Sequence, residues 1–456
     1  MRALCRLGIA SRRGFGRVVP DPFAIAVLLA VVVMAVALAA GRAPLDLLRD
    51  FSGGSGLWKL LAFTMQMCTM LVLGTALAAA PAVRQGLAAL VRWAPSPRVL
   101  VALVALASIG LSLLNWSLAI VGGALVAREA GRVAARRGWA LHYPLLCAAG
   151  YAGLMTWHGG LSGSAPLKAA TEQGMQEVLG AGLAARAGAV PLTDTIFGPL
   201  NLLVSGGLLV LGPLLFGLLT PRAGEDPEPM AAPVVDDEPP VVDDEPPPTT
   251  AIERIERSSL VVWLLALPMA AALGLYLADQ GLARLDFDTV NLVLWCAALI
   301  LHGRPMRFLA ACEEGMRGCT GIVLQFPLYG AIMGMMAGAG LSSALSRWFA
   351  TAGAEAFTSV GFLAAGVLNL LVPSGGGQWA VQGPILVEGA LQLHLPVADV
   401  VMAMAYGDQW TNMLQPFWAL PLLGIMGLRA KDIVGYTGVA CLAMGAYVAI
   451  VLALMT

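Results

Sequence analysis

The chain has 456 residues, of which 58% are hydrophobic and 12% are charged, and its formal net charge is −1. A water-soluble protein has no interior that could hold so much apolar surface, so the surplus must face lipid, and the bilayer is the expected partner. The balanced charge indicates no nucleic acid as a partner, and the scattered cysteines and histidines predict no metal site and no cofactor.

Residues 1–21 carry arginines interspersed with apolar residues, and the segment is followed by the first apolar run. No apolar stretch precedes a small-residue cleavage site in this segment, which argues against a signal peptide. We expect a basic amphipathic segment that lies on the cytoplasmic face of the membrane. Because positively charged segments stay in the cytoplasm, the N-terminus is predicted to be cytoplasmic.

The first apolar runs predict an outward span at 23–41 and an inward span at 57–80. The next apolar run, 99–127, has arginines on both flanks. As one helix it would be about 43 Å long, whereas the hydrocarbon core of a bilayer is roughly 30 Å thick. Two short arms that meet near Asn115-Trp116-Ser117 satisfy both constraints. We therefore predict a re-entrant hairpin that enters from the cytoplasm.

From Tyr143 the chain is predicted to cross outward through a span that is broken at His158–Pro166, a stretch with three glycines. It is then predicted to return at about 194–219, which completes a first membrane repeat at 22–219. Residues 220–258 are rich in proline and acidic residues and contain a tandem Pro-Val-Val-Asp-Asp-Glu-Pro. Such a composition cannot form a core, so we expect a disordered cytoplasmic linker.

The part after the linker, 259–456, is predicted to hold an extra outward span at 260–278 and then a second repeat. That repeat begins with an inward span at 289–302 and an outward span at 320–341. No lysine or arginine occurs between Arg347 and Arg429, as expected for segments outside the cytoplasm.

Within this uncharged window, Phe357–Val372 and Trp379–Leu393 flank the sequence Pro-Ser-Gly-Gly-Gly-Gln at 373–378. This breaker predicts a second re-entrant hairpin, which enters from the outside. A second broken span at 398–427, interrupted around Asp408–Gln415, and a final outward span at 432–454 are predicted to follow.

The order of span, span, hairpin, broken span and span occurs twice, with opposite membrane orientation. When the halves are aligned, Gln66 falls near Gln325, Asn115 near Asn369, and Pro166 near Pro416. The predicted fold is therefore an all-α polytopic membrane protein with two inverted-topology repeats, each with a re-entrant helical hairpin and a broken transmembrane helix. Secondary transporters use this architecture and hold their substrate near the midplane, where the breaks meet.

Helix breaks inside a membrane need protein or water as backbone partners, so the four breaks predict one polar cavity. Helix N-termini at the hairpin tips favour an anion, and the expected absence of lysine and arginine near any break favours a monocarboxylate over a phosphate. The predicted substrate-binding residues are Asn115, Trp116, Ser117, His158, Ser162, Ser164, Ser374, Gly375, Gly376, Gln378, Trp379, Gln382, Trp410 and Gln415.

A coupling-ion site is predicted at Asp408, Asn369 and Asn412, because an acid within an apolar span is costly and is a functional candidate. Asp408 could carry a proton or bind sodium. The alternatives are that it lies near the membrane surface or caps a half-helix starting near Asn412. His158 could titrate or be a polar filler. The tryptophans beside the breaks could shape a pocket for a short acyl chain or anchor the chain at the membrane interface.

Several motifs resemble the bacterial short-chain fatty acid transporters, the AtoE-type permeases. They are Leu-Ala-Phe-Thr-Met-Gln-Met at 61–67, Thr-Trp-His-Gly-Gly-Leu-Ser-Gly-Ser at 156–164, Val-Pro-Ser-Gly-Gly-Gly-Gln-Trp at 372–379 with Gln-Gly-Pro at 382–384, Ala-Tyr-Gly-Asp-Gln-Trp at 405–410 and Gln-Pro-Phe-Trp-Ala-Leu-Pro at 415–421. The resemblance covers nearly the whole chain except the linker. Members of that family often have glycine where His158 stands and glutamate where Asp408 stands.

The resemblance implies uptake of acetoacetate or butyrate across the bacterial inner membrane, and membership of the wider ion-transporter superfamily implies elevator-like movement. We therefore expect a secondary active transporter for short-chain monocarboxylates, coupled to H⁺ or Na⁺ by symport. A carrier for dicarboxylates or other organic anions is the alternative. An enzyme is disfavoured because HExxH, GxSxG and paired acids at helical spacing are missing, and a sensor because the linker is too short and polar to be an output domain. A homo-oligomer remains open.

Overall fold

The computed structural model describes residues 22–139, 141–220, 248–371, 373–415 and 417–456. Across these ranges the regular secondary structure is helical, as predicted. Six helices are long and apolar enough to cross a membrane: Leu61–Ala79, Pro97–Leu114, Pro199–Leu218, Ser259–Gln280, Pro305–Gly338 and Ala430–Met455. The predictions for residues 1–21, for 221–247 and for Pro416 lie outside the described residues.

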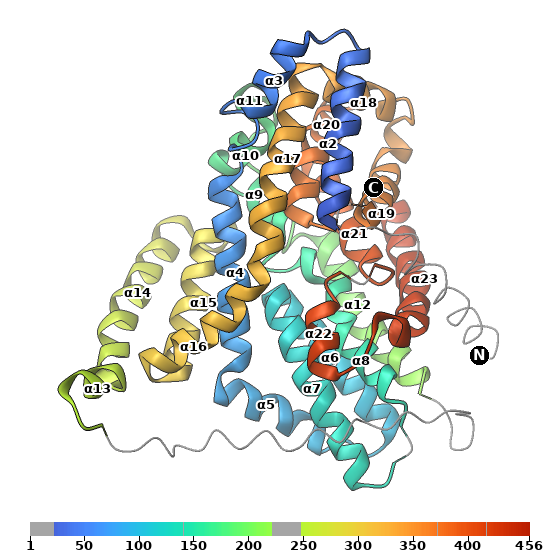
Figure 1. The fold of residues 1–456 in the computed structure, drawn as a ribbon. Helices are drawn as coiled ribbons and strands as arrows, with labels where there is room; N and C mark the ends of the chain where they lie inside the picture. Colours follow the sequence, from blue (N-terminus) through green and yellow to red (C-terminus); the bar gives the residue numbers. More distant parts are fainter. Residues whose placement is uncertain (1–21, 140, 221–247, 372, 416) are drawn as a thin grey trace.

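The elements follow one another along the chain as shown in Figure 1. They are α2 (Pro22–Ala39), α3 (Pro44–Ser52), α4 (Leu61–Ala79), α5 (Pro81–Arg92), α6 (Pro97–Leu114), α7 (Trp116–Arg136), α8 (Tyr143–Tyr151), η1 (Ala152–Met155), η2 (Trp157–Gly159), α9 (Ser164–Ala169), α10 (Glu172–Leu179), α11 (Ala181–Ala187), α12 (Pro199–Leu218), α13 (Ala251–Glu256), α14 (Ser259–Gln280), η3 (Leu282–Arg284), α15 (Phe287–His302), α16 (Pro305–Met316), η4 (Arg317–Cys319), α17 (Thr320–Gly338), α18 (Leu341–Ala350), α19 (Ala354–Leu371), α20 (Gly375–Gln392), α21 (Val397–Thr411), α22 (Leu420–Met426) and α23 (Ala430–Met455).

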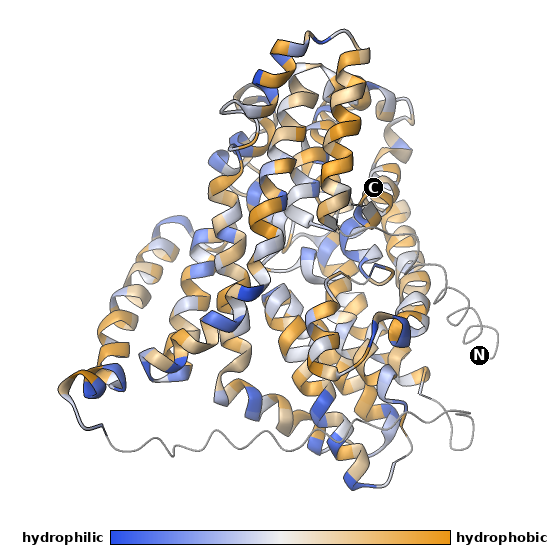
Figure 2. Ribbon diagram, in the orientation of Figure 1, coloured by the Kyte–Doolittle hydropathy of each residue, from blue (hydrophilic) through white to orange (hydrophobic). Residues whose placement is uncertain are grey.

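The outer helices expose apolar side chains, which Figure 2 shows as orange ribbons along much of the molecule. Helix α14 is the clearest case, because Leu264, Leu267 and Leu275 are each more than 60% exposed. Such a surface is stable only against hydrocarbon. The helix therefore presents a lipid-facing side, as expected for a multi-pass membrane protein.

Helices α6 and α7 form a helical hairpin whose turn is the single residue Asn115. Its side-chain Oδ1 accepts hydrogen bonds from the backbone N–H groups of Ser117 and Leu118, which caps the start of α7. At the open end of the hairpin, the guanidinium of Arg137 donates to the backbone carbonyl oxygens of Arg92 and Ala94. The chain therefore enters and leaves this hairpin at one end of the molecule, beside α5.

Helices α19 and α20 form a second hairpin, and the hydroxyl of Ser374 caps α20 by accepting a bond from the N–H of Gly377 at 3.2 Å. At its open end, Gly389 lies so close to Phe357 that an added Cβ would be 2.4 Å from the phenyl ring. Ser343 in α18 donates to Glu388 at the same end. In Figure 1, α18 and α5 lie at opposite ends of the molecule, so the two hairpins point toward each other.

Two interrupted segments occur where breaks were predicted, with one difference in position. The first passes from α8 through η1 and η2 to α9, and His158 lies in η2. The second consists of α21 and α22, but α21 continues to Thr411. The predicted start of the break at Asp408 is therefore wrong, and so is the alternative that Asp408 caps a helix starting near Asn412. Asp408 lies in the helical last turn of α21 instead.

Short helices fill several segments that were predicted as loops. Helix α16 and the turn η4 lead directly into α17, so the predicted loop between the spans at 289–302 and 320–341 is helical. The last part of the predicted disordered linker forms α13, which a capping box between Thr250 and Glu253 starts. The short helices α13 and α16 mix polar and apolar residues, so they lack the long apolar runs from which the spans were predicted.

Candidate functional site

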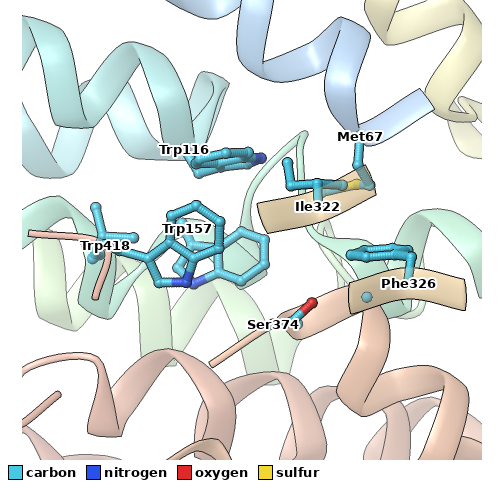
Figure 3. Close-up of a pocket in the computed structure, with 10 residues that line it drawn as sticks. Met67, Trp116, Trp157, Ile322, Phe326, Ser374 and Trp418 are labelled. Carbon is cyan, nitrogen blue, oxygen red and sulfur yellow. The ribbon is translucent and has the colours of Figure 1, made fainter. Parts of the chain in front are cut away.

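A small cavity lies where the two hairpin tips meet the first interrupted segment. Its volume is about 20 Å³, which is enough for roughly one water molecule. Figure 3 shows the indole rings of Trp116, Trp157 and Trp418 facing Ile322, Phe326 and Met67, with the hydroxyl of Ser374 between them. The complete lining is Met67, Trp116, Leu154, Trp157, Ile322, Phe326, Ser374, Gly375, Gly376 and Trp418.

The three glycines that begin α20 allow aromatic rings to approach its backbone. A Cβ on Gly375 would be 2.5 Å from the ring of Trp157, and one on Gly376 would be 2.7 Å from the ring of Phe63. A Cβ on Gly377 would be 2.3 Å from the ring of Tyr329. The Gly-Gly-Gly sequence was interpreted as part of a flexible breaker, but these residues are helical and their small size is what the packing requires.

The tip of the first hairpin is already hydrogen-bonded within the protein. Asn115 accepts from the N–H groups of Ser117 and Leu118, and the hydroxyl of Ser162 accepts from the N–H of Trp116 at 3.0 Å. These bonds use the first three backbone donors of α7. The expectation that free N–H groups at this helix N-terminus would bind the anion is therefore wrong.

Side-chain N–H groups provide donors at this site instead. Within the described part of the chain, the indole Nε1 atoms of Trp116 and Trp157 and the Nδ2 atom of Asn115 are buried and have no hydrogen-bond partner. A buried polar group without a partner costs roughly 1–3 kcal/mol, so unpaired donors in a cluster indicate a ligand. Both tryptophans line the cavity, and an oxygen-rich anion would satisfy them.

His158 and Asp408 form a buried pair next to the cavity. Their side chains are 0% and 1% exposed, and the distance from His158 Nδ1 to Asp408 Oδ2 is 2.7 Å. The ring of Trp157 stacks on the imidazole with 4.3 Å between the centroids. Asp408 is therefore a buried acid with a buried histidine as its partner.

The hydrogen bonds assign the tautomer of His158. The backbone N–H of Ala165 donates to Nε2 at 2.9 Å, so Nε2 carries no hydrogen. Nδ1 is therefore the protonated nitrogen and donates to Asp408. The imidazole thus links the carboxylate of Asp408 to the backbone N–H of Ala165.

Amide side chains hold the backbone around this pair. The Nδ2 of Asn369 donates to the carbonyl of Asp408 at 2.7 Å and approaches Asn412 Oδ1 at 3.1 Å. Gln415 also donates to Asn412 Oδ1. The Oε1 of Gln409 accepts from the N–H of His158. The predicted coupling-ion residues Asp408, Asn369 and Asn412 are therefore brought together.

Some predicted site residues lie away from the cavity. Gln378 bridges the two arms of the second hairpin by donating to the carbonyl of Ala365 and to Gln382. Trp379 is fully buried in a separate hydrophobic cluster. Trp410 stacks on Phe362 and donates to the carbonyl of Cys441. Ser164 is buried, with no partner for its hydroxyl among the described residues.

Four residues that the sequence reasoning did not select belong to this region. Trp418 and Phe326 line the cavity, and Asn201 donates to the carbonyl of Gly159 at 2.9 Å. Lys168 lies two residues after Pro166 and is only 4% exposed, so the prediction that no cationic side chain accompanies a break is wrong. Because a charged residue within a membrane span is costly and is a functional candidate, Lys168 could have been selected from the sequence.

Comparisons with known proteins identify relatives over almost the whole chain. The sequence profile of a family described as "Short chain fatty acid transporter" matches residues 3–455. A protein of Escherichia coli K12 named "Putative short-chain fatty acid transporter" is 36% identical over 95% of this chain and 96% of its own length. A protein of the same name from Haemophilus influenzae is 34% identical over 91% of this chain and 92% of its own length.

Two solved transporter structures have a similar fold. The YdaH transporter of Alcanivorax borkumensis superposes with a TM-score of 0.61 at 16% identity, covering 95% of this chain and 98% of that one. MtrF of Neisseria gonorrhoeae, described as one of a class of antimetabolite efflux pumps, gives a TM-score of 0.54 at 16% identity, with 98% and 96% covered. At this identity the similarity extends to the fold alone.

Proposed function

We propose that this chain carries short monocarboxylates such as butyrate and acetoacetate across the inner membrane. The chain belongs to the short-chain fatty acid transporter family, whose members are transporters and not enzymes. The observation that supports the substrate class most directly is the pair of unpartnered indole N–H groups in an otherwise apolar, aromatic cavity. A carboxylate would accept from the indoles, and a short acyl chain would contact Phe326, Ile322 and Met67.

Binding requires the cavity to expand. A volume of about 20 Å³ admits roughly one water molecule, and butyrate has six heavy atoms. The tips of the two hairpins form opposite walls, so their separation would create the space. Movement of the hairpins with the interrupted segments, in an elevator-like manner, would open the cavity to one side of the membrane at a time. This mechanism assumes that both hairpins are re-entrant and that the two repeats are inverted.

The coupling ion in this proposal is a proton carried by Asp408. Asp408 is buried beside His158 and Trp157 stacks on that imidazole, so substrate binding at Trp157 would place a negative charge near the carboxyl group of Asp408. Two nearby anions favour uptake of one proton. Symport then follows, because the proton and the substrate each increase the affinity of the site for the other.

Uptake into proteoliposomes tests the proposal. We expect labelled butyrate to accumulate when an inward proton gradient is imposed, and unlabelled acetoacetate to compete. Accumulation driven only by a sodium gradient would replace the proton in the mechanism. Competition by dicarboxylates, with none by monocarboxylates, would favour the alternative organic anion carrier. Failure of both gradients to drive butyrate uptake would contradict the proposed function.

A further inference from the structure

Lys168 is the one lysine or arginine that is buried in the described part of the chain. It is on α9, and it bonds to Glu177 on α10 and, at 3.1 Å, to Gln66 Oε1 on α4. It also lies 4.5 Å from the ring centroid of Phe63 and 5.8 Å from that of Phe287. A buried ammonium needs an anionic partner, and here Glu177 provides it.

One aromatic ring separates this ammonium from the cavity. Phe63 packs against Phe326, which lines the cavity, with 5.4 Å between the ring centroids. A Cβ added to Gly376, which is also in the lining, would be 2.7 Å from the Phe63 ring. Phe63 therefore packs against the ammonium and against two lining residues, and transfer of an anion from the ammonium to the cavity would require this ring to move.

The other side of Lys168 leads to the surface. The side chain of Glu177 is 27% exposed, and Gln66 donates to the exposed Asp288 at 2.8 Å. An anion that arrived by this side would meet the Lys168 ammonium before Phe63 and then the indole donors. The ammonium would offset the loss of hydration that a carboxylate suffers on leaving water.

We propose that Lys168 is a further substrate-binding residue, whose ammonium pairs with the carboxylate of the incoming monocarboxylate. In the absence of substrate, the carboxylate of Glu177 pairs with this ammonium and so competes with the substrate. The inference rests on the proposed function, because it takes the same ligand. The exchange breaks the ion pair between Lys168 and Glu177 and forms one between Lys168 and the substrate. Glu177, being partly exposed, is then hydrated.

Variants of the two partners distinguish this role from a structural ion pair. In the full-length protein, Lys168→Gln is expected to raise the KM for butyrate roughly 10- to 100-fold, the effect of losing one charge-assisted bond. Glu177→Gln is expected to lower the KM, because the competing carboxylate is gone. Lys168→Arg should retain most of the wild-type affinity. A structural pair predicts that Lys168→Gln and Glu177→Gln change uptake in the same direction.

Thermal unfolding of the purified protein provides a readout that does not depend on transport. Butyrate is expected to raise the Tm of the wild type, to raise it more in Glu177→Gln and to leave Lys168→Gln unchanged. The matched control is Arg49→Gln, which removes an exposed ion pair with Asp46. Equal responses in all variants would overturn the role of Lys168, whereas a wild type that neither binds nor transports butyrate would contradict the proposed function itself.

Discussion

The buried pair of His158 and Asp408 joins η2 to the last turn of α21. An acid in an apolar stretch predicted a functional position for Asp408, because burial of an unpaired charge is costly. Its partner could not be predicted, since His158 is 250 residues away along the chain and becomes a neighbour only when α21 packs beside η2. Local sequence patterns carry no information on such contacts.

At this position we predict that Asp408→Asn abolishes proton-driven accumulation of butyrate but leaves the protein folded. The Oδ1 of asparagine can still accept from Nδ1 of His158, so the hydrogen bond is kept and only the ionisable group is lost. Accumulation under a proton gradient and exchange of butyrate at equal concentrations are the two measurements. The matched control is Asp399→Asn, in the first turn of the same helix. Unchanged accumulation in Asp408→Asn would assign the residue to structure.

Lys168 was missed for a different reason. It lies two residues beyond Pro166, just outside the break predicted at His158–Pro166, and its burial depends on packing against Phe63 and Phe287 from other helices. The sequence could not distinguish the roles of Trp418 and Trp410, because both tryptophans lie near the second break. Only the packing places Trp418 at the cavity and Trp410 against Phe362.

The helices themselves were more predictable than their contacts. Apolar length predicted the long spans, and length with basic flanks predicted the interruption near Asn115. Glycine and proline predicted the interruptions near His158 and Ser374, since these residues act on the local backbone. The helical state of Gly375–Gly377 was not predictable, because glycine disfavours helices in isolation. Tertiary packing against Trp157, Phe63 and Tyr329 reverses that preference.

This packing leads to a prediction at the start of α20. Gly375→Ala is expected to reduce butyrate uptake strongly and to destabilise the protein by about 1–3 kcal/mol, because the new methyl group must displace the ring of Trp157. Uptake and Tm of the purified variant are the measurements. Gly110→Ala in α6 is the control, since nothing lies within 4 Å of its added Cβ. Wild-type uptake in Gly375→Ala would show that Trp157 does not have to stay in place.

At the scale of the whole molecule, charge and hydropathy predicted two similar halves, and the structure adds that two helical hairpins meet tip to tip. The order of spans follows from local composition, whereas the meeting of Trp116 with Trp418, at 4.9 Å between centroids, depends on contacts between distant segments. The direction in which each hairpin enters a membrane remains a prediction.

Accessibility labelling tests that direction. Cysteines that replace Arg98, at the start of α6, and Arg136, at the end of α7, are expected to react with a membrane-impermeant maleimide from the cytoplasmic side only. The bonds from Arg137 to Arg92 and Ala94 hold these two helix ends together. Labelling of the two positions from opposite sides would make the run 99–127 a single ordinary crossing and would remove the basis for a re-entrant site.

The small size of the cavity has an energetic consequence for a cell. Aromatic rings from both hairpins and the interrupted segments reduce the space between them to roughly the volume of one water molecule. Protons and small cations move readily only along connected chains of water molecules. Closely packed aromatic rings leave no room for such a chain. We therefore expect this arrangement to pass no ion leak, which would keep ion gradients available for work.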